Sequence, residues 1–146
     1  MKKILVILVM AFFSANLLAN DHGDYVRTDE GTFFFKRVKM GINCCLVGVT
    51  ENGEKVKFNK PQILAYCKDN QVYEKVRLYN NNEATDKEEF MALVTYRHGL
   101  KLYKYENMNG IASEKFRRYF IFKGDKYVLE VTERNRPTLV SFFNSK

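Results

Sequence analysis

Apolar and polar residues alternate with a period of two along most of the chain, and the last third shows this pattern most clearly. Phe116, Phe120 and Phe122 fall on one side of a segment, as in a strand with a buried face. Short polar turns separate the strands of three predicted hairpins: residues 44–50 with 55–58, 90–96 with 100–106, and 115–123 with 126–132. In the first hairpin, Asn52 and Gly53 are predicted to form a two-residue type I′ turn.

The other segments complete a mainly β prediction. Residues 72–79 are predicted as a strand and residues 20–30 as a loose polar arm, while residues 61–68 fit either a helical turn or a strand. Thr85 is predicted to cap a short helix, because Glu88 follows three positions later. A C-terminal helix from about Pro137 is expected to bury its apolar side chains, which are Leu139, Val140, Phe142 and Phe143.

These elements predict one fold class. We expect a mainly β (or α+β) protein in which hairpins form an antiparallel sheet. The pattern gives about seven to nine strands, with one or two short helices, the C-terminal helix among them.

The first nineteen residues have the pattern of an export signal. Lys2 and Lys3 precede an unbroken apolar run over residues 4–13, and the small Ala19 suits the position before a signal-peptidase cut. The segment is shorter than the roughly 20 apolar residues of a membrane-spanning helix. We expect residues 1–19 to be removed, which leaves residues 20–146 as a single β-rich domain without a stable membrane anchor. In this respect the chain resembles small exported proteins of Gram-negative bacteria, and we expect it in the periplasm or outside the cell.

The charge of the chain is mildly basic. The formal net charge of +7 falls to +5 without Lys2 and Lys3, since 22 Lys and Arg then face 17 Asp and Glu. Such an excess favours anionic partners such as lipid head groups, acidic glycans or nucleic acid, and it also serves solubility. Export argues against nucleic acid.

The three cysteines suggest a disulfide, because export normally exposes thiols to an oxidising compartment. Neighbouring residues of a strand point to opposite faces, so only one of Cys44 and Cys45 shares a face with Cys67. Cys45 alternates with Val47 and Val49, which are expected to face the core, and we therefore favour a bridge from Cys45 to Cys67. Three buried free thiols, or a Cys44 bridge between two chains, are the alternatives.

The chain is poor in the groups that enzymes use. It has two histidines, and it contains no Gly-rich phosphate loop, Gly-x-Ser-x-Gly, His-Glu-x-x-His or Cys-x-x-Cys. A Cys67–His98 pair would make a nucleophile, but nothing in the sequence places the two together. Paired acids among Asp86, Glu88 and Glu89 could hydrolyse glycosides, although a solvated helix start explains them equally well. No cofactor is predicted.

Cleavage after Ala19 would create an amino terminus able to bind a metal ion. Asn20, Asp21 and His22 would supply a free amine, two backbone amides and an imidazole, a square-planar set that suits Cu(II) or Ni(II). This arrangement resembles the amino-terminal copper and nickel motif of other secreted proteins. A polar arm without metal is the alternative.

Tyrosines interleaved with cations in the last two hairpins form the candidate binding surface. Tyrosine rings stack on sugars or peptide groups, and neighbouring Lys and Arg attract anions. The candidate residues are Lys101, Tyr103, Lys104, Tyr105, Arg117, Tyr119, Lys123 and Tyr127. The alternative is a structural role, with half-buried tyrosines on a sheet and lysine stems lying across them.

Together these patterns favour a secreted or periplasmic, non-enzymatic binding module that recognises a protein or a glycan through a sheet face or edge. Two other classes stay open. One is an exported hydrolase that uses carboxylates or a cysteine. The other is a structural or assembly component of the cell envelope.

Overall fold

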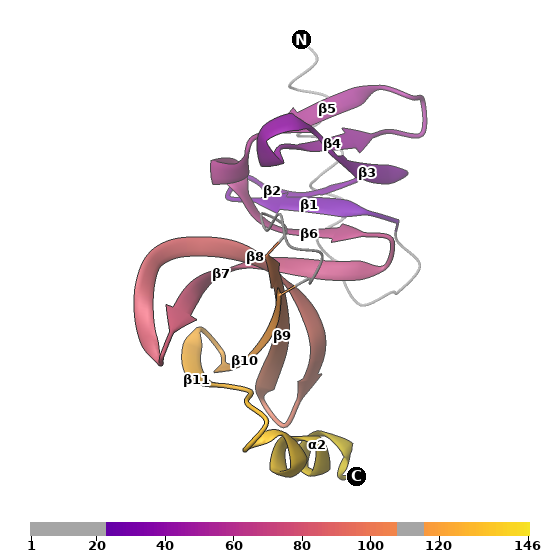
Figure 1. The fold of residues 1–146 in the computed structure, drawn as a ribbon. Helices are drawn as coiled ribbons and strands as arrows, with labels where there is room; N and C mark the ends of the chain where they lie inside the picture. The colour runs from indigo at the N-terminus through magenta and orange to yellow at the C-terminus, as the bar shows by residue number, and fades with distance from the viewer. Residues whose placement is uncertain (1–22, 108–115) are drawn as a thin grey trace. The chain divides into compact units, whose positions relative to one another are not determined.

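A computed structural model describes residues 23–107 and 116–146, and within these residues it contains eleven strands (Figure 1). The strands are β1 (Tyr25–Thr28), β2 (Gly31–Phe34), β3 (Arg37–Met40), β4 (Leu46–Val49), β5 (Lys55–Phe58), β6 (Ile63–Lys68), β7 (Gln71–Asn80), β8 (Glu83–Arg97), β9 (Leu100–Asn107), β10 (Phe116–Lys123) and β11 (Lys126–Glu130). Two 3-10 turns, η1 (Ile42–Cys44) and η2 (Lys60–Gln62), and the C-terminal helix α2 (Arg136–Asn144) accompany them. The predicted mainly β, antiparallel fold with a C-terminal helix is confirmed.

The hydrogen-bonded strand order is β11-β10-β9-β8-β7-β6-β1-β2 in one sheet and β3-β4-β5 in the other. The chain nevertheless divides into two compact units, the first ending at Tyr73 and the second beginning at Glu74, within β7. Each unit is described by itself below. That residues 20–146 form a single domain stays a prediction.

The first unit packs β1, β2 and β6 against the three-stranded sheet β3-β4-β5 through aromatic rings. The Phe58 ring contacts the rings of Phe33 and Phe35 at centroid distances of 5.4 and 5.7 Å. Gly48 of β4 lies directly against the Phe35 ring, and a Cβ at this position would overlap it. The absence of a side chain at Gly48 therefore lets the two layers approach closely.

A buried carboxylate joins three segments of the first unit. Asp24, which is 8% exposed, accepts the backbone N–H of Val38 in β3 at 2.7 Å and the backbone N–H of Asp69 at 2.9 Å. Its own carbonyl accepts the N–H of Phe35 at 2.8 Å. The start of β1, the strand β3 and the turn between β6 and β7 are thus held together by one residue.

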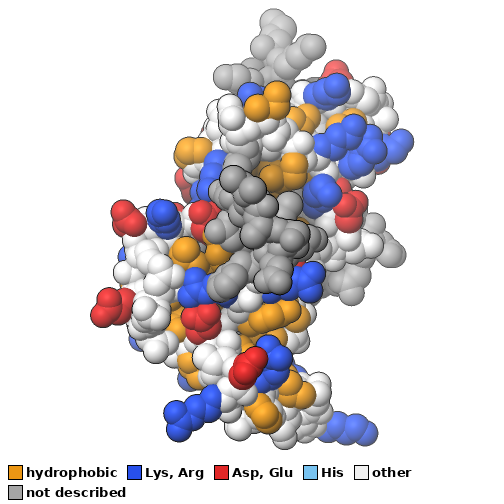
Figure 2. Space-filling model, viewed as in Figure 1, with side chains coloured by type: hydrophobic (Ala, Val, Ile, Leu, Met, Phe, Trp, Pro, Cys, Tyr) orange, Lys and Arg blue, Asp and Glu red, His pale blue; other side chains and the backbone are white. Residues whose placement is uncertain are grey.

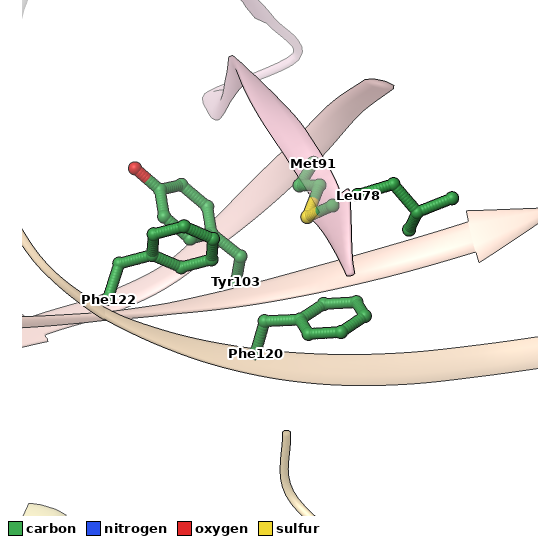
Figure 3. Close-up of a cluster of buried hydrophobic side chains, with 5 residues drawn as sticks. All are labelled: Leu78, Met91, Tyr103, Phe120 and Phe122. Atoms are coloured by element: carbon green, nitrogen blue, oxygen red, sulfur yellow. The ribbon is translucent and has the colours of Figure 1, made fainter. Parts of the chain in front are cut away.

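The second unit has an aromatic core on one face of its sheet (Figure 3). Leu78, Met91, Tyr103, Phe120 and Phe122 come from four neighbouring strands and are each at most 8% exposed. The Tyr103 and Phe122 rings meet edge to face, with their centroids 5.5 Å apart. The predicted hairpins β8–β9 and β10–β11 are confirmed by their antiparallel registers.

The C-terminal helix forms where the sequence predicts it, but its packing differs from the prediction. None of the residues of α2 is buried, and Val140 and Phe142 are 52% and 39% exposed. The helix is attached to the β8–β9 turn by a hydrogen bond from Arg97 to the Phe143 carbonyl and by contact of the Phe142 ring with His98. A nine-residue helix held at one end of the sheet leaves much of its apolar surface in water.

Three local predictions are wrong. Residues 83–97 form the long strand β8 in place of a helix capped at Thr85, whose hydroxyl instead donates to the Leu78 carbonyl at 2.7 Å. The arm expected at residues 20–30 contains the strand β1 where it is described. In the β4–β5 loop only Gly53 has positive φ, and the Thr50 N–H donates to the Glu54 carbonyl, so the loop that this pair closes has three residues and not two.

The predicted disulfide from Cys45 to Cys67 is also absent: both cysteines are buried free thiols. Strand registers explain this. Leu46 and Gly48 carry the core face of β4, so Cys45 lies on the outer side with Val47, and both sulfur and valine lie against Gly41. Cys67 pairs with Tyr25, on the face of its sheet opposite to the one that bears Val26 and Phe33. The two thiols therefore lie on faces that point away from each other.

Among the described residues, no helix has the length and apolar character that crossing a membrane requires. The predicted export signal over residues 1–19 lies outside the described part of the chain and stays a prediction.

Replacing Asp24 by alanine is expected to lower the free energy of unfolding by about 3 kcal/mol, because two buried backbone N–H groups lose their acceptor. Asp24→Asn should cost about as much, since its amide oxygen can accept from only one of the two N–H groups and its NH2 group, a donor, faces the other. Urea unfolding followed by circular dichroism measures both. The exposed Asp29→Ala serves as control, and equal stabilities of Asp24→Ala and this control would contradict the assignment.

The free thiols give a second prediction. Burial raises the pKa of the Cys67 thiol and the negative charge of Asp24 raises it further, so less thiolate forms at a given pH. Cys67 should therefore react with iodoacetamide only when the pH is raised above the range of an ordinary thiol, or after unfolding in urea. Peptide mapping by mass spectrometry without reductant measures this, and a linked Cys45–Cys67 peptide would contradict it.

Candidate anion-binding face

The outer face of the sheet β3-β4-β5 carries a concentrated positive charge. Arg37 and Lys39 of β3 lie opposite Val49 and Val47 of β4, and these valines lie opposite Lys55 and Lys57 of β5. Since directly paired residues share a face, two valines form the middle of this face and four cations flank them. We call these six residues the basic face: Arg37, Lys39, Val47, Val49, Lys55 and Lys57.

All four cations of the basic face are exposed, and within the described chain none of them has an ion-pair partner. Figure 2 shows Lys and Arg side chains gathered over these strands. The nearest acids in sequence, Glu51 and Glu54, belong to the β4–β5 loop at the end of the hairpin. The positive charge of this face is therefore available to a partner.

Regular strand geometry sets the spacing of these charges. Adjacent strands lie about 4.8 Å apart and alternate residues about 7 Å apart, so the cations form a rectangle of about 10 by 7 Å. A single small anion cannot contact all four corners. The arrangement suits a partner that carries several negative charges at similar intervals.

The eight residues predicted as a binding surface are divided between the two faces of the second unit's sheet. In the β9–β10 register, Tyr103 pairs with Phe120 and Tyr105 with Arg118, whereas Lys104 pairs with Tyr119. Lys101, Tyr103, Tyr105 and Tyr127 therefore share the core face, and Lys104, Arg117, Tyr119 and Lys123 lie on the opposite face. The structure thus does not bring them together as one surface.

The core-face residues are engaged internally. Tyr103 is 2% exposed and donates its hydroxyl to Glu74, which also accepts from Lys101 at 3.0 Å. Tyr127 stacks on Tyr79 with centroids 4.0 Å apart. These contacts match the structural alternative, in which the tyrosines build the sheet.

Two of the three opposite-face cations also have an internal partner. Lys104 and Arg117 both reach Glu106, at 3.3 Å each. Because the Glu106 carboxylate partly neutralises both cations, this face carries less unpaired positive charge than the basic face. The other two residues of this set are Lys123, which lies beside the β10–β11 turn, and Tyr119, which lies opposite Lys104.

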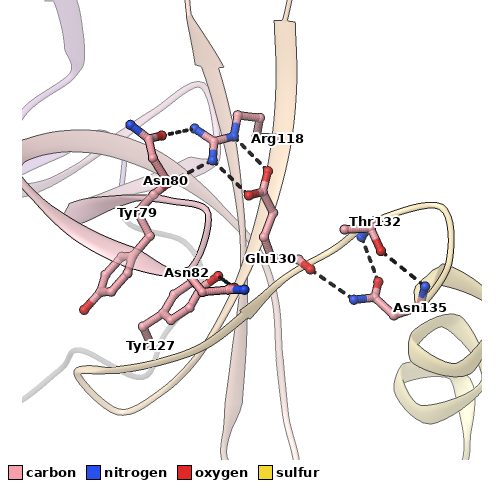
Figure 4. A network of polar contacts seen from close by, with 8 residues as sticks. All are labelled: Tyr79, Asn80, Asn82, Arg118, Tyr127, Glu130, Thr132 and Asn135. Atoms are coloured by element: carbon pink, nitrogen blue, oxygen red, sulfur yellow. Dashed lines mark hydrogen bonds and ion pairs between the residues drawn. The ribbon is translucent and has the colours of Figure 1, made fainter.

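Arg118, which the sequence analysis did not single out, is the most strongly coordinated cation (Figure 4). Its guanidinium donates to Glu130 at 2.8 and 2.9 Å, to the Asn80 side chain at 2.9 Å and to the Tyr79 carbonyl at 2.8 Å. It also lies 4.8 Å from the centre of the Phe120 ring. Four of the five guanidinium N–H groups are used within the unit, so Arg118 ties β10 to β7 and β11 and does not serve a ligand.

The remaining candidates do not form a reactive cluster. Cys67 is buried and accepts a hydrogen bond from the Asn70 backbone, and His98 lies against the Phe142 ring. Asn20, Asp21 and His22 lie outside the described residues. Within residues 23–107 and 116–146, no three His, Cys, Asp or Glu side chains gather as a metal site would require. A cavity of about 200 Å³ in the first unit is lined by Thr28, Asp29, Glu30, Phe33, Phe58 and Gln62.

Comparison of the chain with protein families, with curated proteins and with solved structures finds no match.

The core-face tyrosines predict a decrease in stability at alkaline pH. Burial raises the pKa of the Tyr105 and Tyr127 phenols, and the negative charges of Glu89 and Glu130 raise them further. The folded state thus favours the neutral phenol, and its advantage is complete below the ordinary tyrosine pKa of about 10 and is lost as the pH rises through the higher folded value. Ultraviolet titration of tyrosinate should show a late transition that moves back to about pH 10 in urea. Identical titrations of folded and unfolded protein would contradict this.

Proposed function

We propose that this protein is an exported, non-enzymatic binding module that recognises an acidic glycan through the basic face. The observation that carries this proposal is the absence of ion-pair partners, among the described residues, for four exposed cations on one sheet face. Leaving like charges close together costs electrostatic free energy, which a bound polyanion would recover. Some cations elsewhere in the described chain, among them Lys101 and Arg117, have carboxylate partners.

The shape of the face supports an extended ligand. The basic face is one side of a three-stranded sheet, and the described cavity is lined by other residues. An array of regularly spaced cations suits a ligand chain that carries negative charges at similar intervals. A polymer of acidic sugars is such a chain. Val47 and Val49 supply an apolar strip between the two rows, on which a sugar ring can lie.

Export places the module where such polymers occur. This part of the proposal rests on the apolar leader Met1–Ala19 and predicts a mature chain that begins at Asn20. Mass spectrometry of the protein recovered from the periplasm or medium tests it. Recovery of the chain from the cytosol with Met1 in place would contradict export without bearing on the basic face.

Replacing Lys39, Lys55 and Lys57 by glutamine should weaken binding to an acidic polysaccharide such as heparin or alginate about tenfold, at roughly 0.5 kcal/mol for each lost exposed contact. Calorimetric titration measures the dissociation constant. Binding by the unchanged protein should weaken with added salt, because exposed charges are screened, and neutral dextran should not bind.

The matched control removes the same charge from the second unit, with Lys104→Gln, Lys123→Gln and Lys126→Gln. This variant should bind within about twofold of the unchanged protein, since only nonspecific attraction falls. Equal losses in the two triple variants would show that net charge and not the basic face governs binding, and no binding by the unchanged protein would reject the proposal.

A further inference from the structure

The C-terminal helix presents an apolar surface that the second unit does not cover. At 100° per residue, Leu139, Val140, Phe142 and Phe143 fall on one side of α2, while Thr138, Ser141 and Asn144 take the other. Leu139 and Phe143 are half-exposed, and Val140 and Phe142 are exposed. Apolar side chains of this size are normally buried, so this side of α2 suits contact with another apolar medium.

Cationic residues lie at both ends of this apolar side. Arg134, Arg136 and Lys146 are exposed and have no ion pair within the described residues, and Glu133 is the only acid from residue 133 to the end of the sequence. Exposed aliphatic and aromatic side chains beside cations are the composition of helices that lie in the interface of an anionic membrane.

We propose that α2 docks on an anionic lipid surface. The charge pattern selects this occupant over a second copy of the chain, because contact between two such helices would bring cations together. A parallel pair sets Arg134 and Arg136 beside their own copies, and an antiparallel pair sets them beside Lys146 of the other copy. The helix lies flat, with Val140 and Phe142 entering the boundary between head groups and acyl chains. The arginines contact lipid phosphates from the same side. This docking does not use the basic face.

Sedimentation with lipid vesicles tests the proposal on the exported protein. Vesicles of phosphatidylcholine with phosphatidylglycerol should bind it, vesicles of phosphatidylcholine alone should bind it at least about tenfold more weakly, and salt should weaken the binding. Failure to bind the anionic vesicles overturns the proposal.

Two variants separate the apolar and ionic contributions. Val140→Ser with Phe142→Ser should lower vesicle binding about tenfold, because two side chains no longer leave water, while the net charge stays the same. Arg134→Gln with Arg136→Gln should give a similar loss without altering the apolar side. The control, Thr138→Ser with Ser141→Ala on the opposite side of α2, should bind within about twofold of the unchanged protein.

Circular dichroism and thermal unfolding confirm that each variant is folded, and the arginine variant decides the case if the serine variant unfolds. Unchanged vesicle binding in folded α2 variants overturns the proposal. The proposal is also overturned if the triple Lys→Gln variant of the basic face loses vesicle binding while the α2 variants keep it. Polysaccharide binding by the α2 variants reports separately on the proposed glycan recognition, so the two proposals can fail independently.

Discussion

The buried carboxylate of Asp24 is the contact on which the arrangement of the first unit depends. A charge removed from water is tolerated only where donors surround it, and here the backbone N–H groups of Val38 and Asp69 supply them. Val38 belongs to β3, whose next-door residues Arg37 and Lys39 point the other way. One hydrogen bond at the edge of β3 that does not pair with β4 thus helps to hold the cations of β3 in place.

The distribution of ion pairs separates structural from available charge. In the second unit the guanidinium of Arg118 is enclosed by Glu130, Asn80 and a backbone carbonyl, and its pKa is raised above the ordinary value by the hydrogen bond to Glu130. Such a group contributes to folding because removing either partner would leave a half-buried charge. An exposed cation without a carboxylate contributes little to folding. The four such cations of the basic face therefore fit the proposed binding of an anionic partner better than a role in folding.

Alternation along the chain was sufficient to predict most of the strands, their antiparallel hairpins and the C-terminal helix, but neither β1 nor the first part of β8. It was not sufficient to assign side chains to one surface, because neighbouring positions such as Tyr103 and Lys104 take opposite faces once the register is fixed. The predicted disulfide from Cys45 to Cys67 was wrong for the same reason, because Val47, which was expected to face the core, lies on the outer side of β4. Burial of the helix could not be predicted either, because the pattern of α2 does not say whether a partner surface exists within the chain.

The basic face, in contrast, was accessible from the sequence. The segments Arg37–Met40 and Lys55–Phe58 each place a cation at alternate positions, and both flank the apolar segment Leu46–Val49. Combining the predicted β4–β5 hairpin with a third adjacent strand would have aligned the cations on one side. These cations were not predicted as a binding surface, because the residues between them are valines and not the aromatic residues typical of a glycan site.

Lysine on edge strands has a second physical use, which is to prevent a sheet from pairing with another chain. β3 and β5 are the edges of their sheet, so their cations serve that purpose whether or not a ligand binds. Preventing an edge strand from pairing with another chain, however, requires only that charged residues lie along the edge. Acidic residues interspersed with basic ones would achieve this with less electrostatic repulsion. Cations alone, at matched positions on both edges and without internal carboxylates, exceed that requirement. The two roles also agree with each other, because a face that repels its own copies stays free for an anionic partner.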